Sequence, residues 1–267
     1  MNRRTADPLA PLLDLPGVAE AVAAARAAVD DVHRHPVNRH GWPATAAEAS
    51  LRAARASALL SGGSAALSPA SASDAGDAND AGAAGAAGGA AVSDPVLAGC
   101  VRIADAVGTV LATWQRAPLQ ALARLHVLAA ADLVSDDELL GRPRPEPAVS
   151  ARLHQLAGLV TGGSAVPGVV LAAVVHGELL TLAPFGSADA VVARAASRLT
   201  AIATGLDAKG LAVPEVGHLA AATEYREAAA AFAGGTAEGL ARWLVHCCDA
   251  WVAGAREARS IAAAAAV

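Results

Sequence analysis

The sequence is poor in aromatic residues and in cysteine, and these shortages argue against several classes of protein. Phe, Trp and Tyr make up 3% of the 267 residues although 54% are hydrophobic, so the apolar content consists mostly of small side chains. Such residues favour closely packed helices and argue against an all-β domain. The three cysteines, Cys100 and the neighbours Cys247 and Cys248, lack the spacing of metal ligands. We therefore expect no disulfide framework, no bound metal and no cofactor.

Positive charge is also scarce. The chain has 20 basic and 25 acidic residues, a net charge of -5 at pH 7, and Lys209 as its only lysine. Arginine in place of lysine, together with abundant alanine, is typical of a high-GC bacterial genome and implies no function. Because no run of basic residues could neutralise a phosphate backbone along its length, we expect no nucleic-acid partner.

No segment has the form of a signal peptide or a membrane span. The start of the chain, Met1–Leu15, contains acidic and proline residues where a signal peptide needs an unbroken apolar core. The longest apolar run, Val166–Val175, is interrupted by Pro167 and Gly168 and is too short to cross a bilayer. We expect a soluble, cytoplasmic protein without a membrane partner.

Apolar residues recur at helical spacing over most of the chain. Nearly every such stretch begins at Pro, Asp, Thr or Ser and stops at Gly or Pro, as helices do. Thr45 and Glu48 have the form of a capping box. The predicted helices cover residues 17–32, 45–60, 95–114, 118–133, 149–159, 167–182, 188–204, 215–233 and 236–265. The predicted fold class is all-α, a helical bundle in a single domain.

Two stretches interrupt this pattern. From Ser61 to Ser93 the sequence is almost only Gly, Ala, Ser, Asp and Asn, which cannot offset the entropy lost on ordering. We predict a disordered insertion there, which divides the chain into N-terminal helices (1–60), the insertion (61–94) and a helical core (95–267). The histidines between the first two predicted helices are interpreted as part of a solvated loop rather than as a metal site.

The stretch 171–198 predicts a ligand site. Its first helix, which carries His176, must end near Ala183, because Pro184 disfavours the helical conformation of the residue before it. A Gly-Ser turn then leads into a second helix. The N-terminus of such a helix presents free N–H groups and the positive end of the helix dipole, so we expect an anion site at this turn.

The order of these residues resembles the core of the Fic (Fido) family of nucleotidyl transferases. The family's motif reads H-P-F-x-x-G-N-G-R-x-x-R, and residues 183–194 read A-P-F-G-S-A-D-A-V-V-A-R. The segments LARLH, GRPR and VVHGELLTLAPF and the helix pair from Tyr225 to Trp243 are also similar to the family. S-A-L-L-S-G at 57–62 looks like the inhibitory helix of many members. The resemblance implies a Fic-like helical bundle over residues 45–60 and 95–255.

The departures from the motif remove the chemistry that the resemblance implies. The motif His, the general base of the family, is replaced by Ala183, which has no titratable group. Gly186 stands at the acidic metal-ligand position, and Asp189 puts a carboxylate where a phosphate would lie, although it is well placed as a helix N-cap. Arg194 is the one motif arginine retained. Ser61 replaces the inhibitory Glu.

Two residues have alternative interpretations. His176 could replace the lost base, but a buried histidine bonded to the backbone is the preferred interpretation. Arg194 could bind a phosphate, or it could pair with Glu178 or Glu215. We therefore assign no catalytic residue. The predicted ligand-binding residues are Gly186, Ser187, Asp189 and Arg194.

Three functions remain in competition. The first is a catalytically silent pseudoenzyme that acts by binding an unidentified protein, or by residual binding of a nucleotide or anion at turn 186–194. The second is an active nucleotidyl or phosphate-group transferase of the AMPylation type with a non-standard site. The third, an oxidoreductase, lacks any nicotinamide or flavin fingerprint. In addition, the prolines of Val134–Ala148 could not form the hairpin flap that family members present there.

Overall fold

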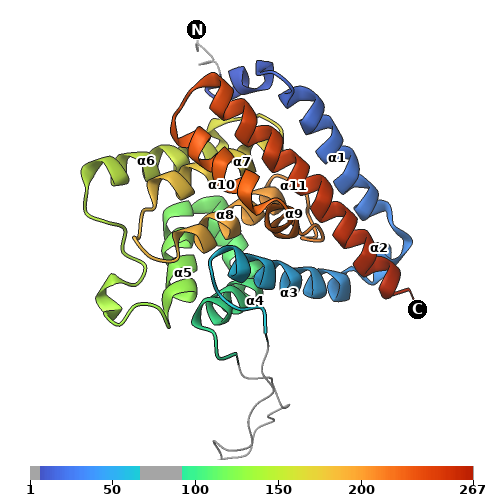
Figure 1. Cartoon of the computed structure of the whole chain (residues 1–267), viewed down its shortest axis with the longest axis horizontal. Helices are drawn as coiled ribbons and strands as arrows, with labels where there is room; N and C mark the ends of the chain where they lie inside the picture. The colour runs from blue at the N-terminus through green and yellow to red at the C-terminus, as the bar shows by residue number, and fades with distance from the viewer. Residues whose placement is uncertain (1–6, 67–91, 267) are drawn as a thin grey trace, which may run out of the picture.

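Two consecutive helices, α7 and α8, form the centre of the computed structural model, which describes residues 7–66 and 92–266 (Figure 1). α7 (Gly168–Leu182) is apolar all round and most of its side chains are buried, as is typical of a core helix. α8 (Asp189–Ala203) buries every residue from Val191 to Ala201. The two helices pack against each other, so the loop that joins them is held between two rigid elements.

The other helices surround this pair. They are α1 (Val18–Arg34), α2 (Pro36–His40), α3 (Trp42–Leu60), α4 (Pro95–Arg116), α5 (Pro118–Ala130), α6 (Pro147–Gly158), α9 (Pro214–Ala220), α10 (Ala222–Ala233) and α11 (Ala237–Ala264). One apolar cluster joins α4, α5 and α6 to α7 and α8, and a second joins α1, α10 and α11 to them. The described residues therefore form one all-α domain without strands, which confirms the predicted fold class.

The N-terminal helices pack against the C-terminal part of the chain. α1 lies along α11, and α3 packs against α4 and α9 (Figure 1). Arg52 of α3 forms ion pairs with Glu48 on its own helix at 2.7 Å and with Glu257 on α11 at 2.5 Å. The last helix is thus packed against both α1 and α3, and its contact with α3 includes an ion pair.

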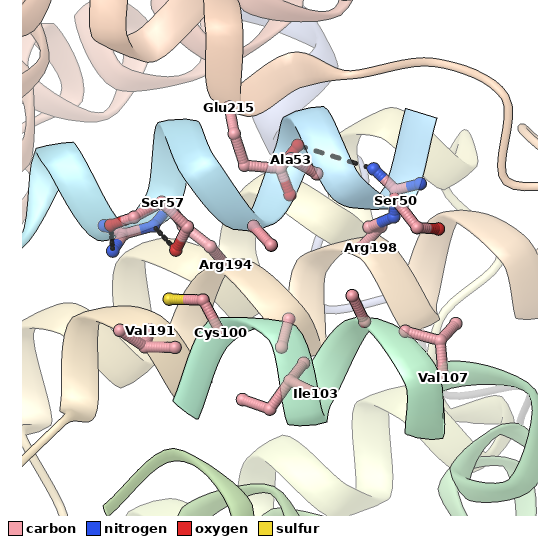
Figure 2. Close-up of a pocket in the computed structure, with 13 residues that line it drawn as sticks. Ser50, Ala53, Ser57, Cys100, Ile103, Val107, Val191, Arg194, Arg198 and Glu215 are labelled. Atoms are coloured by element: carbon pink, nitrogen blue, oxygen red, sulfur yellow. Dashed lines mark hydrogen bonds and ion pairs between the residues drawn. The ribbon is translucent and has the colours of Figure 1, made fainter. Parts of the chain in front are cut away.

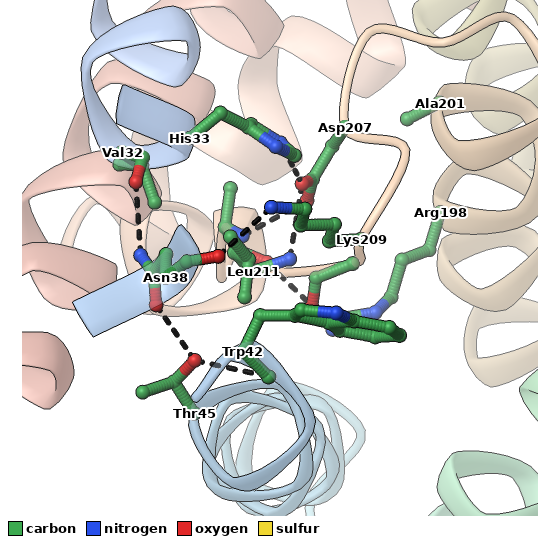
Figure 3. Close-up of polar contacts among 12 residues, drawn as sticks. Val32, His33, Asn38, Trp42, Thr45, Arg198, Ala201, Asp207, Lys209 and Leu211 are labelled. Carbon is green, nitrogen blue, oxygen red and sulfur yellow. Dashed lines mark hydrogen bonds and ion pairs between the residues drawn. The ribbon is translucent and has the colours of Figure 1, made fainter. Parts of the chain in front are cut away.

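A polar network attaches the corner between α1, α2 and α3 to the connection that follows α8 (Figure 3). Asp207, which is 1% exposed, accepts hydrogen bonds from two backbone N–H groups of its own loop, and its Oδ1 lies 2.8 Å from His33 Nε2. Lys209 Nζ donates to the Asn38 carbonyl at 2.8 Å. His33 is therefore paired with a carboxylate, whereas the sequence predicted a solvated loop.

Three details of the predicted helices are wrong. α3 begins at Trp42, because proline is tolerated in the first turn of a helix, so Thr45 lies inside the helix and its hydroxyl donates to Asn38 instead of capping. The connection before α3 contains the short helix α2. The helix predicted over 215–233 is two helices, α9 and α10, which meet at Ala221.

The predicted insertion falls largely on residues 67–91, which lie outside the described residues. The segments on either side of it are close together, because a Cβ atom placed on Gly63 would lie 2.8 Å from Asp94 Oδ1. α4, which follows the insertion, is long and apolar enough by length and composition to cross a membrane. In the structure α4 packs against α3, α5 and α8 within the bundle.

Candidate functional site

The loop between α7 and α8 is a tight turn with left-handed residues at both ends. Ala183 ends α7 with a φ of 43°, and Ala188 precedes α8 with a φ of 51°. This region of backbone conformation costs a residue with a Cβ about 1–2 kcal/mol. Gly186, between them, has a φ of 75°, which glycine adopts freely. α7 therefore ends where Pro184 predicts, and the turn is built from small residues throughout.

Asp189 satisfies a backbone donor of this turn. Its Oδ1 accepts a hydrogen bond from the Phe185 N–H at 2.9 Å. The N-cap residue of α8 is Ala188, so the predicted N-cap role of Asp189 is wrong, and its carboxylate bonds back to the loop. Burial raises the pKa of Asp189, while the N–H groups of Phe185 and Gly186 act in the opposite direction. A donor that a bound anion would need is thus already taken by the chain's own carboxylate.

Arg144, in the proline-rich connection between α5 and α6, closes the C-terminal end of α7. Its Nε donates to the Ala183 carbonyl and its Nη2 to the Leu182 carbonyl, each at 3.0 Å. Its backbone N–H donates to the Pro184 carbonyl at 2.7 Å. The last carbonyls of a helix lack partners within the helix, and a cation there also stabilises the negative end of the helix dipole. The connection is therefore fixed against the loop.

His126 of α5 supports the loop from the other side. Its ring lies 4.3 Å from the Phe185 ring, centroid to centroid, with 5° between the planes. Gly141 N–H donates to His126 Nδ1 at 2.9 Å, so Nε2 carries the ring proton and donates to Ser187 Oγ at 3.0 Å. Burial lowers the pKa of His126, which keeps the ring neutral. Because neither nitrogen is a free acceptor, His126 is not placed to act as a base toward Ser187.

Arg194 is buried and held by the C-terminal turn of α3 (Figure 2). Arg194 is 3% exposed. Nε donates to Ser57 Oγ at 2.8 Å, and Nη2 donates to the Ser57 carbonyl at 3.0 Å and to Ser61 Oγ at 2.6 Å. Neither Glu178 nor Glu215 is its partner, so of the two alternatives for Arg194 the ion pair is wrong. The guanidinium is therefore surrounded by neutral acceptors.

His176 belongs to a buried aromatic cluster that the sequence analysis missed. Its Nε2 lies 2.9 Å from the Tyr225 hydroxyl oxygen, to which Arg194 Nη1 donates at 3.4 Å. His218 of α9 and His246 of α11 complete the cluster, with 3.0 Å between His218 Nδ1 and His246 Nε2. His176 is buried as predicted, but its partner is a hydroxyl group rather than the backbone.

The electrostatics of this cluster keep His176 neutral. Burial holds its pKa well below the ordinary value, and the positive charge of Arg194 lowers it further. Because Arg194 donates to the Tyr225 hydroxyl, the hydroxyl proton is directed to His176 Nε2, which acts as the acceptor. At 1% exposure His176 has no contact with solvent through which a substrate could reach it. The residues come from separate helices, so no spacing in the sequence could have revealed them.

A pocket opens beside the loop. It has a volume of about 360 Å³, and we call it the Phe185 pocket; its lining residues are Leu119, Leu122, Pro143, Arg144, Pro145, Ser150, Leu153, His154 and Phe185. Most of the lining residues are apolar, as is typical of a binding pocket.

In the described part of the chain, no group of three or more His, Cys, Asp or Glu side chains is arranged to hold a metal ion. Of the predicted ligand-binding residues, Gly186, Ser187 and Asp189 lie together in the turn, whereas Arg194 points to α3. Comparison with models of protein families finds no match, and comparison with curated proteins finds none either.

Proposed function

We propose that this chain is a Fic-like (Fido-domain) protein of the cytoplasm whose degenerate motif transfers no nucleotide, and which acts by binding another protein. The proposal rests on the resemblance of residues 183–194 to the family's motif. The observation that carries it is the Asp189 carboxylate, which accepts the Phe185 N–H in the turn where the motif of the family holds phosphate.

Three features of the site argue against nucleotide transfer. The side chain at Ala183 cannot take a proton from a target hydroxyl. The carboxylate of Asp189 would repel a phosphate that approached the turn. The donors of Arg194, the retained arginine, are directed to Ser57, Ser61 and Tyr225, so an anion would have to displace the end of α3. Each of these would have to change before a nucleotide could react.

Purified protein is expected to show no shift of its thermal midpoint with ATP, with or without Mg²⁺. A ligand that binds only the native state must raise that midpoint, so the measurement is sensitive to binding of any kind. Incubation with a lysate and ATP labelled in the adenylate group is expected to label no protein. Labelling that disappears in the His176→Ala variant would overturn the proposal in favour of the active transferase.

A restored variant provides the matched control. We expect ATP binding to appear when Ala183→His, Ala188→Gly, Asp189→Asn and Ala190→Gly are combined, because Asn removes the repelling charge and glycine relieves the left-handed strain at residue 188. Val191 is left unchanged, because it is 5% exposed and an arginine there would be a buried unpaired charge. A folded variant that binds ATP no better than the parent in calorimetry would remove the Fic-like assignment.

The Phe185 pocket supports the second half of the proposal, protein binding. Its floor is the Phe185 ring, which the stack on His126 holds in place, and one wall is the proline-rich connection fixed by Arg144. A rigid, largely apolar pocket suits an apolar side chain of an extended partner segment. Because the connection is rich in proline, the contact would depend on side chains more than on strand pairing.

Selection of displayed peptides on the wild-type protein is expected to yield sequences with a shared large apolar residue. His154→Trp should abolish their binding, because the new ring fills the mouth of the pocket, whereas Gln155→Trp on the same exposed turn of α6 should not. Binding would be measured by fluorescence anisotropy. Peptides that tolerate His154→Trp as well as Gln155→Trp would show that the pocket is not the binding site.

A further inference from the structure

A second hollow lies along the C-terminal half of α8, away from the loop at its N-terminal end. It opens between α3 and α4 and has a volume of about 560 Å³, within the range of small-molecule sites. We call it the α3–α4 groove; its lining includes Trp42, Ala46, Ala47, Ser50, Leu51, Val101, Ala104, Asp105, Val107, Gly108, Leu111, Arg198, Ile202 and Lys209. Trp42 lines the groove and is 38% exposed. It is the largest hydrophobic side chain that is exposed among the described residues.

The walls of the groove are apolar and incompletely covered. On α4 the side chains of Val101, Val107 and Leu111 face the groove and are half-buried, although α4 is one of the most apolar helices of the chain. The facing residues of α3, such as Ala46 and Ala47, are too small to reach them. An apolar molecule between the two helices would remove this surface from water, which is favourable in proportion to the area covered.

The groove continues inward between buried charges (Figure 2). Ser50, Ala104, Val107 and Arg198 line both the groove and an inner cavity of about 30 Å³, which reaches Arg194 and Cys100. Figure 2 shows the two arginines pointing toward opposite ends of this cavity. Arg198 is paired with Glu215 at 3.5 Å, whereas Arg194 is bonded to neutral groups. The inner end of the hollow therefore carries an excess of positive charge.

Lys209, which also lines the groove, is a further cation with unused donors. Lys209 Nζ donates to the Asn38 carbonyl, and in the described part of the chain no carboxylate lies within 4.0 Å of it (Figure 3). An ammonium group has three N–H donors, so two remain for a ligand. Asp105 is the one acidic residue that lines the groove, and it is exposed at the surface of α4. The charge balance of the groove thus favours an anionic group near Lys209.

We propose that the α3–α4 groove binds a medium-chain aliphatic carboxylate. The hydrocarbon chain lies between α3 and α4 against Trp42 and the valines of α4, and the carboxylate accepts hydrogen bonds from Lys209 Nζ. The apolar walls suit the hydrocarbon chain of this ligand, and the unpaired ammonium group of Lys209 suits its carboxylate. The site shares no residue with the Phe185 pocket, so it does not depend on the function proposed above.

Calorimetric titration with sodium decanoate, below its critical micelle concentration, tests the charge. Wild-type protein is expected to bind decanoate, and Lys209→Gln, which keeps a donor for the Asn38 carbonyl, should weaken that binding about tenfold through loss of a charged hydrogen bond. Decanol has the same chain without the charge, so its binding should be equal in both proteins. No binding of decanoate to the wild type, or equal binding to Lys209→Gln, would overturn the proposal.

A second pair of variants tests the location. Gly108→Phe places a ring in the groove without a clash, because a Cβ there has no atom within 4 Å, and it should abolish binding of both decanoate and decanol. Gly158→Phe on α6, which has equally open surroundings outside the groove, should bind as the wild type does. Circular dichroism would verify that both variants are folded. Decanoate binding that survives Gly108→Phe would place the ligand elsewhere and overturn the proposal.

Discussion

Acidification from pH 6.5 to pH 5.0 is expected to lower the free energy of unfolding by up to about 3 kcal/mol, a large part of the total for a domain of this size. The groups responsible are His176 and His218, whose pKa values burial holds well below the ordinary value of 6.5. Each is neutral in the folded state and binds a proton when the chain unfolds. The contribution of each to the slope of stability against pH rises toward a limit of about 1.4 kcal/mol per pH unit as the pH falls below 6.5.

The sign follows from which state binds more protons. Below pH 6.5 the unfolded chain binds a proton at each of these histidines and the folded chain does not, so stability falls as the pH falls. The loss continues down to the lowered pKa of the folded state. Above pH 6.5 both states are neutral and the contribution is constant. Burial raises the pKa of Asp189, so its carboxyl group binds a proton more readily in the folded state than in the unfolded state. Its effect on stability therefore has the opposite sign, and it is confined to the pH range in which this carboxyl group titrates.

The surroundings of His176 explain why it resists protonation. Protonated His176 would lose the acceptor that the Tyr225 hydroxyl needs and would place a second cation near Arg194. His218 faces His176 and His246, so a charge on one of these rings raises the cost of charging the next. The cluster therefore favours a neutral state of all its members.

Urea denaturation at pH 7.5, 6.5, 5.5 and 5.0 would measure this dependence. His176→Gln should reduce the slope of stability against pH by the amount due to one proton, about 1.4 kcal/mol per unit, whatever its effect at pH 7.5. His154→Gln, at an exposed position, should leave the slope unchanged. If stability depends on pH as steeply in the His176→Gln variant as in the wild type, the conclusion that His176 is neutral in the folded protein is wrong.

Gly99→Ala is expected to destabilise the protein by about 3 kcal/mol or more, whereas Gly108→Ala on the same helix should stabilise it by up to about 1 kcal/mol. A Cβ at Gly99 would lie 2.3 Å from the carbonyl oxygen of Ala129, because α4 and α5 approach each other closely at this point. The obstacle is backbone rather than a flexible side chain, so the helices would have to separate.

Gly108 is the matched control for helix propensity. It is exposed, and a Cβ there meets no atom within 4 Å, so alanine only removes the flexibility of glycine. The two variants change the same atoms on the same helix and differ in packing alone. Urea midpoints of the two variants would give the difference. A Gly99→Ala variant as stable as Gly108→Ala would show that α4 and α5 are farther apart than in this structure.

The helices that could be predicted from the sequence are those bounded by proline or glycine. Pro184 correctly marks the end of α7, and Pro95 and Pro118 mark the starts of α4 and α5. The break at Ala221 could not be predicted, because it lies within a run of alanines that favours a continuous helix. It arises because α9 and α10 must pack on different parts of α11.

Only the part of the candidate site that lies within one continuous stretch of sequence could be predicted. The turn and its small residues follow from their order along the chain. The partners of Arg194 do not, because Ser57 is 137 residues away and serines carry no charge that would suggest a pair. Arg144 was also not predictable as the residue that closes α7, since nothing local relates the proline-rich connection to that end of the helix.

The pairing of α1 with α11 has a consequence for synthesis of the chain. The apolar face of α1 is covered by helices from the last quarter of the sequence, and α11 also pairs with α3 through Glu257 and Arg52, which are 205 residues apart. At about 5–20 residues per second, a ribosome needs about 10–40 seconds to make that interval. During that time α1 has emerged without its partner. The nascent chain should therefore engage a chaperone early, and native packing should follow release of the C-terminus.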